Sequence, residues 1–517
     1  MNESTAMPAA DSRPPIAILG VPFDNVTKAE AIARIEAMIA SRQPHYLVTP
    51  NIDFVVKARR DVELRRILLE AHLVLCDGTP LLWISRLLGN ALSERVAGAD
   101  LVPSLIEVAA RKKYRLFLLG ATTESSNQAV CRLQRRYPEL VIAGHYSPPF
   151  NQLLEMDHDD IRSRIMATEP DLLFVSFGCP KQEKWVAMNY RRLGVPVTAG
   201  VGATIDFLAG TVMRAPLWMQ KSGTEWMFRL AQEPRRLFRR YLTDLWAFSA
   251  GIVPQWWELQ ARSRLKISKH QIETARQLAA SGARPGYYCV RMPRRLDVAA
   301  VLQNAPLAKE IEDRTENCLL DMGSTEFVDS TGVGWLIRIK KKLRSKGREL
   351  VLISTTRTVT RALGLMRLTD FFLVARDEEA GHKLLQELTH TYAEPAHVQS
   401  YAACSLRWRG EVTAANADAV WADTRQYLVG LSPDRRKTID LSAVRFIDST
   451  GLGLMVRAKK LSLARAETLA FIGLQPPVLN VLRLSRLEAY LLKAPSPKPT
   501  ELLATPSPDA CESAFPP

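Results

Sequence analysis

The N-terminal half of the chain alternates apolar runs with amphipathic stretches. Nearly continuous apolar runs occupy residues 45–51, 73–78, 114–121, 172–178 and 197–202. Stretches with helical periodicity separate them, and residues 54–71 are an example that predicts one helix. Unbroken apolar runs are typical of strands whose sheet is covered by helices on both faces. The pattern therefore predicts an α/β core built on a parallel, doubly wound sheet.

The C-terminal half contains one segment twice. FVDSTGVGWLIRIKKKLRSKGRELVLI begins at Phe327, and FIDSTGLGLMVRAKKLSLARAETLAFI begins 119 residues later at Phe446. The offset continues without a gap to the pair Leu368 and Leu487. In both copies short β-rich runs precede the DSTG turn, and a helix with basic residues on one face, an apolar strand and another helix follow it. We therefore expect two tandem α/β modules.

A chain of 517 residues is longer than one ordinary domain, so we expect it to consist of several domains and connecting segments. The last twenty or so residues are rich in Pro and Ser, which favours disorder. We expect a flexible N-terminus at 1–15, a core at 16–220, a basic aromatic appendage at 221–262, a linker at 263–286, the two modules at 287–395 and 398–495, and a disordered tail at 496–517.

The chain is basic, and the charge is unevenly distributed. Its 69 Lys and Arg against 54 Asp and Glu give a net charge of +15, which suits a nucleic acid, an anionic membrane or a phosphorylated substrate. Residues 221–270 hold ten basic and four acidic residues together with Trp226, Trp246, Trp256 and Trp257. Because no nucleic-acid motif accompanies the charge, we expect no nucleic-acid partner.

Cysteine usage and hydropathy indicate a cellular location. The 7 cysteines are scattered without a CxxC pair, so neither a disulfide framework nor a zinc module is predicted. The N-terminus lacks the pattern of a signal peptide, and residues 242–257 are too short and too interrupted to span a bilayer. We expect a cytoplasmic protein in a reducing environment, bound peripherally to the inner face of the membrane.

Polar and glycine residues follow the predicted strands at 49–51, 77–78, 178–185 and 200–206. Ligands of open α/β sheets bind at the carboxyl ends of the strands, so these segments are expected to outline one crevice. The run GVGATI at 200–205 follows a dinucleotide-binding fingerprint until Ile205, where that fingerprint has glycine. It is therefore an incomplete signal for a dinucleotide.

Asp77 has two interpretations. It follows the apolar run LVLC and precedes Gly78, so its carboxylate would emerge into a partly desolvated site and suit a general base. Alternatively, it caps the helix that begins at residue 79, which is the commoner role for an isolated Asp before a helix.

Several motifs of the N-terminal half together resemble the WecG/TagA/CpsF glycosyltransferases. They are TPN at Thr49, CDG at Asp77, ERVAGADL at residue 94, GCPKQEKW at Gly178, GVGATIDFLAGTVMRAP at residue 200 and EWMFRLAQEPRRLFRRY at residue 225. The resemblance spans residues 16–241 and implies a Rossmann-like transferase domain with a helical C-terminal appendage. Such enzymes transfer an N-acetylmannosamine-type or related sugar from UDP to a lipid-diphosphate-linked acceptor, with inversion and without a metal.

The resemblance also implies roles for individual residues. Asp77 falls on the proposed base of the family, and Thr49 and Gln182 fall on its polar site residues, which raises the base interpretation above the cap. The expected substrate-binding residues are Asn51, Gly78, Arg95, Asp100, Gly178, Pro180, Lys181, Glu183, Gly202 and Asp206.

The charge that stabilises the leaving diphosphate is expected from arginine, because no metal or other cofactor is expected. The acidic run at 156–160 resembles a metal-binding DxD pair but is better explained as the acidic first turn of a helix. Arg229, Arg236 and Arg239 would share one helical face if Pro234 lies near a turn, and arginine binds phosphate oxygens bidentately. This spacing matches the family's appendage, although a solvated basic face is the simpler alternative.

The aromatic residues of the appendage have two explanations of nearly equal weight. Basic and Trp-rich helices lie at membrane interfaces, where a polyprenyl acceptor is anchored. Alternatively, Trp246, Phe248, Trp256 and Trp257 pack against a neighbouring domain or subunit.

The repeated module resembles STAS domains of the anti-sigma-factor-antagonist type. In those domains a kinase phosphorylates the Ser after the Asp, which switches the binding of a partner protein. Ser330 and Ser449 fall on that position and are candidate phosphorylation sites, although a helix-capping DSTG turn is the favoured explanation of an isolated copy. Arg338 and Arg457 occupy equivalent positions on a partner face or a solvated one.

The sequence therefore predicts an inverting, UDP-sugar-dependent glycosyltransferase joined to two STAS-like regulatory modules, active in bacterial surface or exopolysaccharide biosynthesis. Asp77 would act as base, Thr49 and Gln182 would position the sugars, and the three arginines would hold the diphosphate. Kinase or anti-sigma-type proteins are the expected partners of the modules. The alternative is a partner-switching regulator whose N-terminal domain senses a sugar nucleotide.

Overall fold

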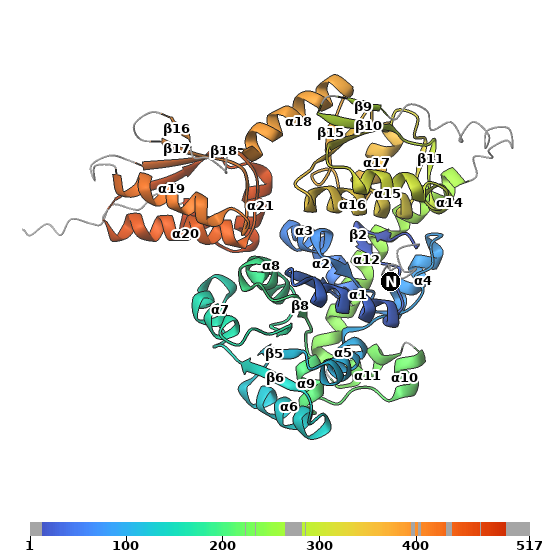
Figure 1. The fold of residues 1–517 in the computed structure, drawn as a ribbon, viewed down its shortest axis with the longest axis vertical. Coiled ribbons are helices and arrows are strands. Elements are labelled where there is room, and N and C mark those ends of the chain that lie inside the picture. The colour runs from blue at the N-terminus through green and yellow to red at the C-terminus, as the bar shows by residue number, and fades with distance from the viewer. Residues whose placement is uncertain are drawn as a thin grey trace, which may run out of the picture.

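The computed structural model describes residues 13–492, apart from 223, 233, 264–281, 285, 394–398, 402–404, 431–436 and 466. Its described part comprises an N-terminal domain with a helical appendage, followed by a first module and a second module (Figure 1). The expected disordered tail at 496–517 lies outside the described residues. The two modules lie on the same side of the N-terminal domain, and helix α3 (Val62–Glu70) lies beneath the place where they meet (Figure 1).

A six-stranded parallel sheet forms the centre of the N-terminal domain, as predicted. Its order is β4-β3-β8-β7-β5-β6, and every pairing is parallel. The strands are β3 (His45–Val48), β4 (Leu73–Val74), β5 (Arg115–Gly120), β6 (Val141–Tyr146), β7 (Leu172–Ser176) and β8 (Val197–Gly200). Each of the five predicted apolar runs contains one of these strands, and β6 is an additional edge strand.

Helices cover both faces of this sheet, because successive strand residues point to opposite sides. Leu173 and Val175 belong to one apolar core, whereas Leu172 and Phe174 belong to the other. The helices are α1 (Lys28–Ser41), α2 (Ile52–Ala58), α3, α4 (Thr79–Leu87), α5 (Gly98–Lys112), α6 (Thr123–Arg136), α7 (His158–Met166), α8 (Lys181–Leu193) and α9 (Thr204–Ala209). The prediction of one helix over 54–71 is wrong, because Asp61 caps a new helix by accepting from the Leu64 amide at 3.0 Å.

The N-terminal segment is anchored where the structure describes it. Arg13 donates to Ser93 Oγ at 2.8 Å and pairs with Glu30, and the carbonyl of Pro14 accepts from Asn90. A two-stranded hairpin follows, formed by β1 (Ile16–Ile18) and β2 (Val21–Phe23). The expectation of flexibility over 1–15 is therefore wrong for residues 13–15, and residues 1–12 lie outside the described part.

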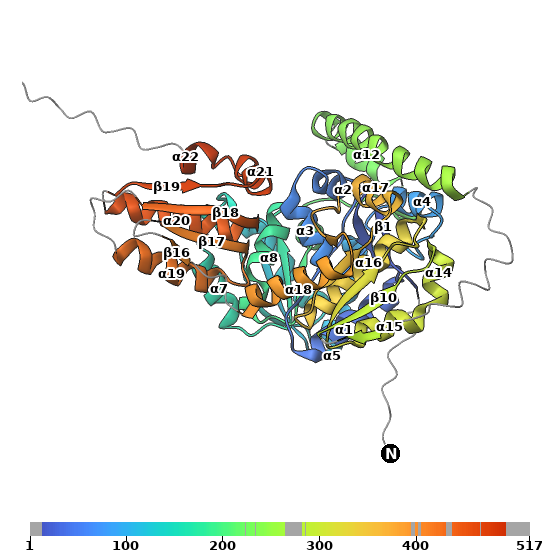
Figure 2. The ribbon, with the colours of Figure 1, turned by 90° about the horizontal axis from the view of Figure 1, so that it is seen from above.

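Three helices form the appendage: α10 (Leu217–Ser222), α11 (Glu225–Gln232) and α12 (Pro234–Ser263). Pro234 is the first residue of α12, a position where its missing N–H costs no helical hydrogen bond. Helix α12 runs along one edge of the molecule and contacts α2 and the first module's α17 (Arg357–Leu365) (Figure 2). Among the described residues, no helix combines the length and apolar composition needed to cross a bilayer.

The first module contains a five-stranded sheet of order β15-β14-β12-β10-β9. Strand β9 (Gly282–Arg284) pairs with β10 (Tyr287–Arg291), although 263–286 was predicted as linker, so this sheet begins earlier than expected. Its other elements are β11 (Arg295–Leu296), α14 (Val298–Gln303), α15 (Ala305–Asp313), β12 (Asn317–Asp321), β13 (Phe327–Val328), α16 (Ser330–Ser345), β14 (Leu350–Ile353), α17, β15 (Leu373–Ala375) and α18 (Glu378–Ala393).

The second module repeats this architecture in a four-stranded sheet of order β16-β17-β18-β19. Helix α20 (Ser449–Ala464) begins 119 residues after α16, and β19 (Leu469–Ile472) and α21 (Pro476–Leu484) keep the same offset from β14 and α17. The structure confirms the predicted tandem repeat. Its remaining elements are β16 (Gln399–Tyr401), β17 (Ser405–Val412), α19 (Ala417–Gly430), β18 (Lys437–Ile447) and α22 (Glu488–Leu492).

Candidate active site

The strand order brings the four predicted polar segments to one edge of the sheet. Strands β4, β3, β8 and β7 are neighbours, so residues 77–78, 49–51, 200–206 and 178–185 follow adjacent carboxyl ends. The amide of Asp77 donates to the carbonyl of Pro50 at 3.1 Å, which joins the first two segments. Thr49 lies against the start of α5, where a Cβ on Gly98 would come within 3.2 Å of Thr49 Oγ1.

Asp77 is half-buried at this edge. It lies between the buried Cys76 and Gly78, and Gly78 occupies the N-cap position of α4. Gly78 has no side chain with which to cap the helix, and Pro80 lies in its first turn. A half-buried carboxylate beside Thr49 can accept a proton from a bound hydroxyl group, which is the role that the sequence predicts.

Gln182 is a buried bridge between two loops. Its Oε1 accepts from the amides of Gly178 and Gly202, each at 3.2 Å, and the residue is only 2% exposed. Its Nε2 donates to Glu183 Oε1 at 2.6 Å. Gln182 therefore holds the β7 and β8 loops at one spacing, which makes it a positioning residue.

Glu183 is buried directly behind this bridge. Burial raises the pKa of its carboxyl to about 7, and hydrogen bonds from Gln182 and Cys179 oppose that rise. A Cβ on Gly200 would lie 2.7 Å from Gln182 Nε2 and 3.1 Å from Glu183 Oε1, so β8 needs glycine where it passes this pair. The backbone requirement explains Gly200 without a dinucleotide.

The loop after β7 is contacted by an ion pair of α2, Lys57 with Asp53, that the sequence analysis did not single out. Lys57 donates to the carbonyl of Cys179 at 3.3 Å and pairs with Asp53 at 2.8 Å. Arg240 of α12 approaches Asp53 to 4.0 Å and Asp244 to 3.8 Å. A basic and an acidic residue four apart in a buried helix were the available signal, and their contact with α12 required the tertiary fold.

A second ion-pair cluster ties the core to the appendage. Arg95 pairs with Asp100 at 2.7 Å and with Glu225 of α11 at 3.5 Å. Arg214 pairs with the same two carboxylates, at 2.7 Å and 3.7 Å. Arg95 and Asp100 were predicted to bind substrate, and the structure places them in this cluster with Arg214, which the sequence had not indicated.

The other predicted binding residues lie around the same sheet edge. Asn51 caps α2 by accepting from the Phe54 amide at 3.2 Å, and Lys181 donates to the Asn151 carbonyl at 2.6 Å. Pro180 follows a cis peptide bond and Asp206 lies in the first turn of α9. Asn51 is therefore engaged in local structure, whereas Asp206 is half-buried at the edge.

The three predicted phosphate-binding arginines are divided between two helices. Arg229 lies in α11, whereas Arg236 and Arg239 lie in α12, because α11 ends at Gln232 and α12 begins at Pro234. The prediction of one shared helical face is therefore wrong. Arg239 is exposed, and the side chains of Arg229 and Arg236 lie outside the described part of the structure.

The acidic run at 156–160 forms the start of α7, as predicted. Asp157 caps that helix by accepting from the Asp160 amide at 3.0 Å, and Asp160 pairs with Arg164 at 2.8 Å. Within the described ranges, no group of three His, Cys, Asp or Glu side chains is arranged to hold a metal ion.

Comparison with known proteins agrees with this geometry. The model of the glycosyl transferase WecG/TagA/CpsF family matches residues 16–262. A relative from Staphylococcus aureus strain MW2, described as N-acetylglucosaminyldiphosphoundecaprenol N-acetyl-beta-D-mannosaminyltransferase, is 30% identical over 224 residues, which cover 43% of this chain and 86% of the relative. The same figures hold for the protein of that description from strain MRSA252.

The chain belongs to the WecG/TagA/CpsF glycosyltransferase family. Its N-terminal domain is a glycosyltransferase, and the modules that follow are STAS domains, matched at residues 281–381 and 397–493. A solved Thermotoga maritima chain described as an anti-sigma factor antagonist is 21% identical and covers 20% of this chain and 92% of its own length, with a TM-score of 0.18.

Both candidate phosphorylation serines are buried against the transferase domain. Ser330 is 0% exposed, and its Oγ accepts from Gln255 Nε2 of α12 at 2.8 Å. Ser449 is 3% exposed, and its Oγ donates to Glu63 Oε2 of α3 at 2.8 Å. The basic residues Arg338 and Arg457 instead contact their own modules, at Glu312 and over the Trp421 ring.

The aromatic residues of the appendage divide into two groups. Phe248 and Trp256 pack against the core of the transferase domain. Trp246 and Trp257 are 79% and 64% exposed, and Trp226, Phe238, Leu242 and Leu245 are exposed as well. The packing explanation is therefore confirmed for Phe248 and Trp256, and the membrane explanation stays a prediction for the exposed residues.

Proposed function

We propose that the chain transfers an N-acetylmannosamine-type sugar, its uronic acid or a related hexose from a UDP-sugar to a polyprenyl-diphosphate-linked acceptor. The observation that carries this proposal is the convergence of Asp77, Thr49 and the Gly178 and Gly200 loops at one edge of the sheet. The activity of the Staphylococcus aureus relatives supports the acceptor class. The product would enter bacterial surface or exopolysaccharide biosynthesis.

The proposed reaction is a single inverting displacement. Asp77 takes the proton from the acceptor hydroxyl as the new glycosidic bond forms, and the C1–O bond to UDP breaks with its electron pair leaving on the diphosphate. Thr49 positions the sugars, and Gln182 acts through the Gly178 and Gly202 amides that it holds. Arginines of α11 and α12 stabilise the departing diphosphate in place of a metal ion.

The base assignment is tested by Asp77→Asn in the full chain. A panel of UDP-sugars is supplied with a lipid-diphosphate-linked N-acetylglucosamine acceptor, and UDP release is measured with and without EDTA. General bases contribute about 100-fold or more, so we expect at least that loss of turnover with Asp77→Asn. The control is Asp159→Asn, an exposed carboxylate of α7. Wild-type transfer by Asp77→Asn would overturn the assignment, and loss of activity in EDTA would overturn metal independence.

The exposed aromatic residues support peripheral membrane binding through the appendage. Interfacial helices bury tryptophan at the headgroup level and attract anionic lipids with arginine, and α12 carries the exposed Trp246 and Trp257 together with the exposed Arg235, Arg239 and Arg240. We expect Trp246→Ser with Trp257→Ser to weaken flotation with phosphatidylglycerol vesicles about tenfold or more. The control Trp83→Ser removes an exposed tryptophan of α4, outside the appendage. Equal flotation of all variants would exclude this surface.

The buried serines support regulation through docking of the STAS modules. Glu63 binds Ser449 and also pairs at 2.8 Å with Lys184 of α8, the helix that carries Gln182. Release of the second module would therefore change the contacts of Glu63 and Lys184, and through α8 it would affect the position of the loops that Gln182 holds. If the chain were instead a sugar-nucleotide sensor, no UDP-sugar would support turnover while a protein partner still bound the modules.

A further inference from the structure

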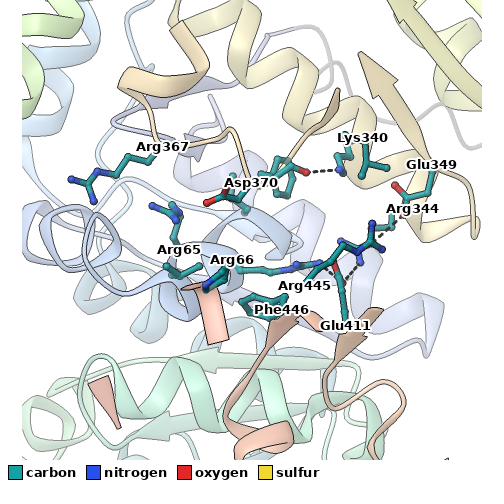
Figure 3. Close-up of a pocket in the computed structure, with 15 residues that line it drawn as sticks. Arg65, Arg66, Lys340, Arg344, Glu349, Arg367, Asp370, Glu411, Arg445 and Phe446 are labelled. Carbon is teal, nitrogen blue, oxygen red and sulfur yellow. Dashed lines mark hydrogen bonds and ion pairs between the residues drawn. The ribbon is translucent and has the colours of Figure 1, made fainter. Parts of the chain in front are cut away.

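A cavity of about 110 Å³ lies where the transferase domain and both STAS modules meet. Helix α3 forms one wall, the first module contributes α16 and the segment after α17, and the second module contributes β17 and β18 (Figure 3). Its volume is several times that needed by one water molecule, so it can hold a small solute. We call it the junction cavity.

Positive charge dominates the junction cavity. Six basic side chains and three acidic side chains line it, so three positive charges are in excess. The basic residues are Arg65, Arg66, Lys340, Arg344, Arg367 and Arg445, and the acidic ones are Glu349, Asp370 and Glu411.

Part of this charge is neutralised by one carboxylate of the second module. Glu411 accepts from Arg66 of the transferase domain at 2.6 Å and from Arg344 of the first module at 2.8 Å (Figure 3). Burial alone would raise the pKa of the Glu411 carboxyl. The charges of these two arginines outweigh burial and lower that pKa to about 2. Glu411 therefore remains an anion that holds the three domains together.

Three other guanidinium groups form no direct ion pair with a carboxylate among the described residues, and each comes from a different domain. They are Arg65 of the transferase domain, Arg367 of the first module and Arg445 of the second module. Arg367 donates to the carbonyl of Arg59. Arg65 is 7% exposed, and its guanidinium makes no direct hydrogen bond or ion pair within the described ranges. Burial lowers its pKa, whereas the charges of Asp370 and Asp61 raise it. A buried guanidinium without an acceptor is costly, and an anion in the cavity would remove that cost.

We propose that the junction cavity binds a small phosphate-bearing anion, held by Arg65, Arg367 and Arg445. Guanidinium groups bind phosphate oxygens bidentately, and three of them among the lining residues match the charge of a diphosphate better than that of chloride. Free oligophosphate and the diphosphate of a nucleotide share this chemistry.

The bound anion would stabilise the docked arrangement, because each domain supplies one of its ligands. Arg65 is two residues from Glu63 on α3, and Glu63 binds Ser449. Occupancy of the cavity is therefore linked to docking of the second module, and the ligand acts as a soluble signal that favours the docked state. This consequence rests on the proposed regulation by docking, whereas binding of the anion does not.

The test is calorimetric titration of the full chain with sodium diphosphate, and separately with orthophosphate and UDP, without any sugar donor or acceptor. We expect saturable diphosphate binding that is at least about tenfold weaker in Arg445→Gln and Arg65→Gln, because each loses a charge-assisted hydrogen bond. Arg425→Gln, an exposed arginine of α19 in the same module as Arg445, should bind like wild type. Asp370→Asn should bind more tightly, because it removes a competing negative charge.

The variants also separate the junction cavity from the active site. The Arg445 side chain is exposed, so Arg445→Gln should keep its fold even if Arg65→Gln does not. Diphosphate binding that is unchanged in Arg445→Gln and Asp370→Asn would overturn the proposal. UDP binding that weakens in parallel with diphosphate would identify a nucleotide as the ligand, whereas weakening for diphosphate alone would identify free oligophosphate. Turnover is not measured, so failure of the proposed transfer reaction would leave this result intact.

Discussion

The two STAS modules share one sequence motif but bind the transferase domain through opposite chemistry. At Ser330 the partner is Gln255, a neutral amide that donates to the hydroxyl. At Ser449 the partner is Glu63, a carboxylate that accepts from the hydroxyl and, at 2.5 Å, from the backbone amide. A negative charge placed on the first serine would meet a donor, whereas one placed on the second would meet another negative charge. The modules are therefore alike as folds and different as switches.

The glycines of the two helices show the same divergence. A Cβ on Gly334 of α16 would lie 2.6 Å from the carbonyl oxygen of Pro15, because the N-terminal hairpin packs directly on this helix. The equivalent Gly453 of α20 would meet only a Leu154 side-chain atom, at 3.9 Å. Close backbone packing therefore adds to the side-chain contacts of the first module, and the second module lacks it at this position.

The largest expected effect follows from placing a charge on the second serine. Ser449→Asp puts a carboxylate against Glu63 in a buried contact, which should cost about 3–5 kcal/mol and release the second module. Hydrogen–deuterium exchange should then rise in α3 and at the start of α20. Glu63→Gln in the same chain should restore protection, and Ser330→Asp should release its module less, because Gln255 supplies a donor. Protection in Ser449→Asp equal to wild type would contradict the charge argument.

Removing the neutral contact should have a smaller effect. Gln255→Ala deletes hydrogen bonds to the Leu19 amide, the Ala17 carbonyl and Ser330, each between 2.8 and 3.1 Å. Buried groups left without partners cost about 1–3 kcal/mol each, so we expect a loss of about 2–4 kcal/mol in urea unfolding. Val253→Ala, an exposed side chain of the same helix, is the control. A loss below about 1 kcal/mol would show that the hairpin alone holds the first module.

The equivalent glycines Gly334 and Gly453 allow the packing of the two modules to be compared directly. Gly334→Ala must displace the backbone of Pro15, so we expect a destabilisation of about 1–3 kcal/mol. Gly453→Ala meets ordinary contact distances in a helix interior and should be neutral or stabilising by up to about 1 kcal/mol. Thermal unfolding of the two variants measures the difference. Equal effects would show that the hairpin does not pack against α16.

The smallest expected effect concerns pH. Burial, with Glu63 nearby, raises the pKa of Asp448 to about 7, and burial raises that of its equivalent Asp329 to about 6. Both groups keep a proton in the folded state that the unfolded chain loses near pH 4, so stability falls as pH rises from about 4 and levels off above these values. Between pH 6 and 7 Asp448 contributes about 1 kcal/mol, and Glu183, whose pKa is also about 7, adds to the same fall in stability. Urea unfolding across this range should show a smaller slope in Glu63→Gln, and an unchanged slope would exclude the influence of Glu63.

The architecture could be predicted from the sequence to a large extent. Apolar runs located five of the strands of the transferase sheet, and the 119-residue offset located the equivalent helices α16 and α20. Asp77 and Thr49 could be singled out because residues after buried strands meet at one sheet edge. Gln182 was found as well, but as a sugar-binding residue, since the sequence does not show that its amide is used by two loops.

Residues that act through long-range contacts were missed. Lys57, Arg214 and Glu63 carry no local pattern that separates them from ordinary charged positions on helices, and their partners lie in the β7 loop, in the ion-pair cluster of α11 and in the second module. The division of the predicted arginines between α11 and α12 also depended on where α11 ends and α12 begins.

The sequence by itself determined the domain order, the parallel sheet, the tandem modules and the family, because periodicity, strand-end residues and motifs are local properties of the chain. Only the tertiary structure decided that both serines face the transferase domain, one toward an amide and the other toward a carboxylate. It also decided that an arginine of each domain lines the junction cavity without a direct ion pair in the described structure. Identical DSTG motifs cannot encode this difference, since the partner that each one meets is set by how the modules pack.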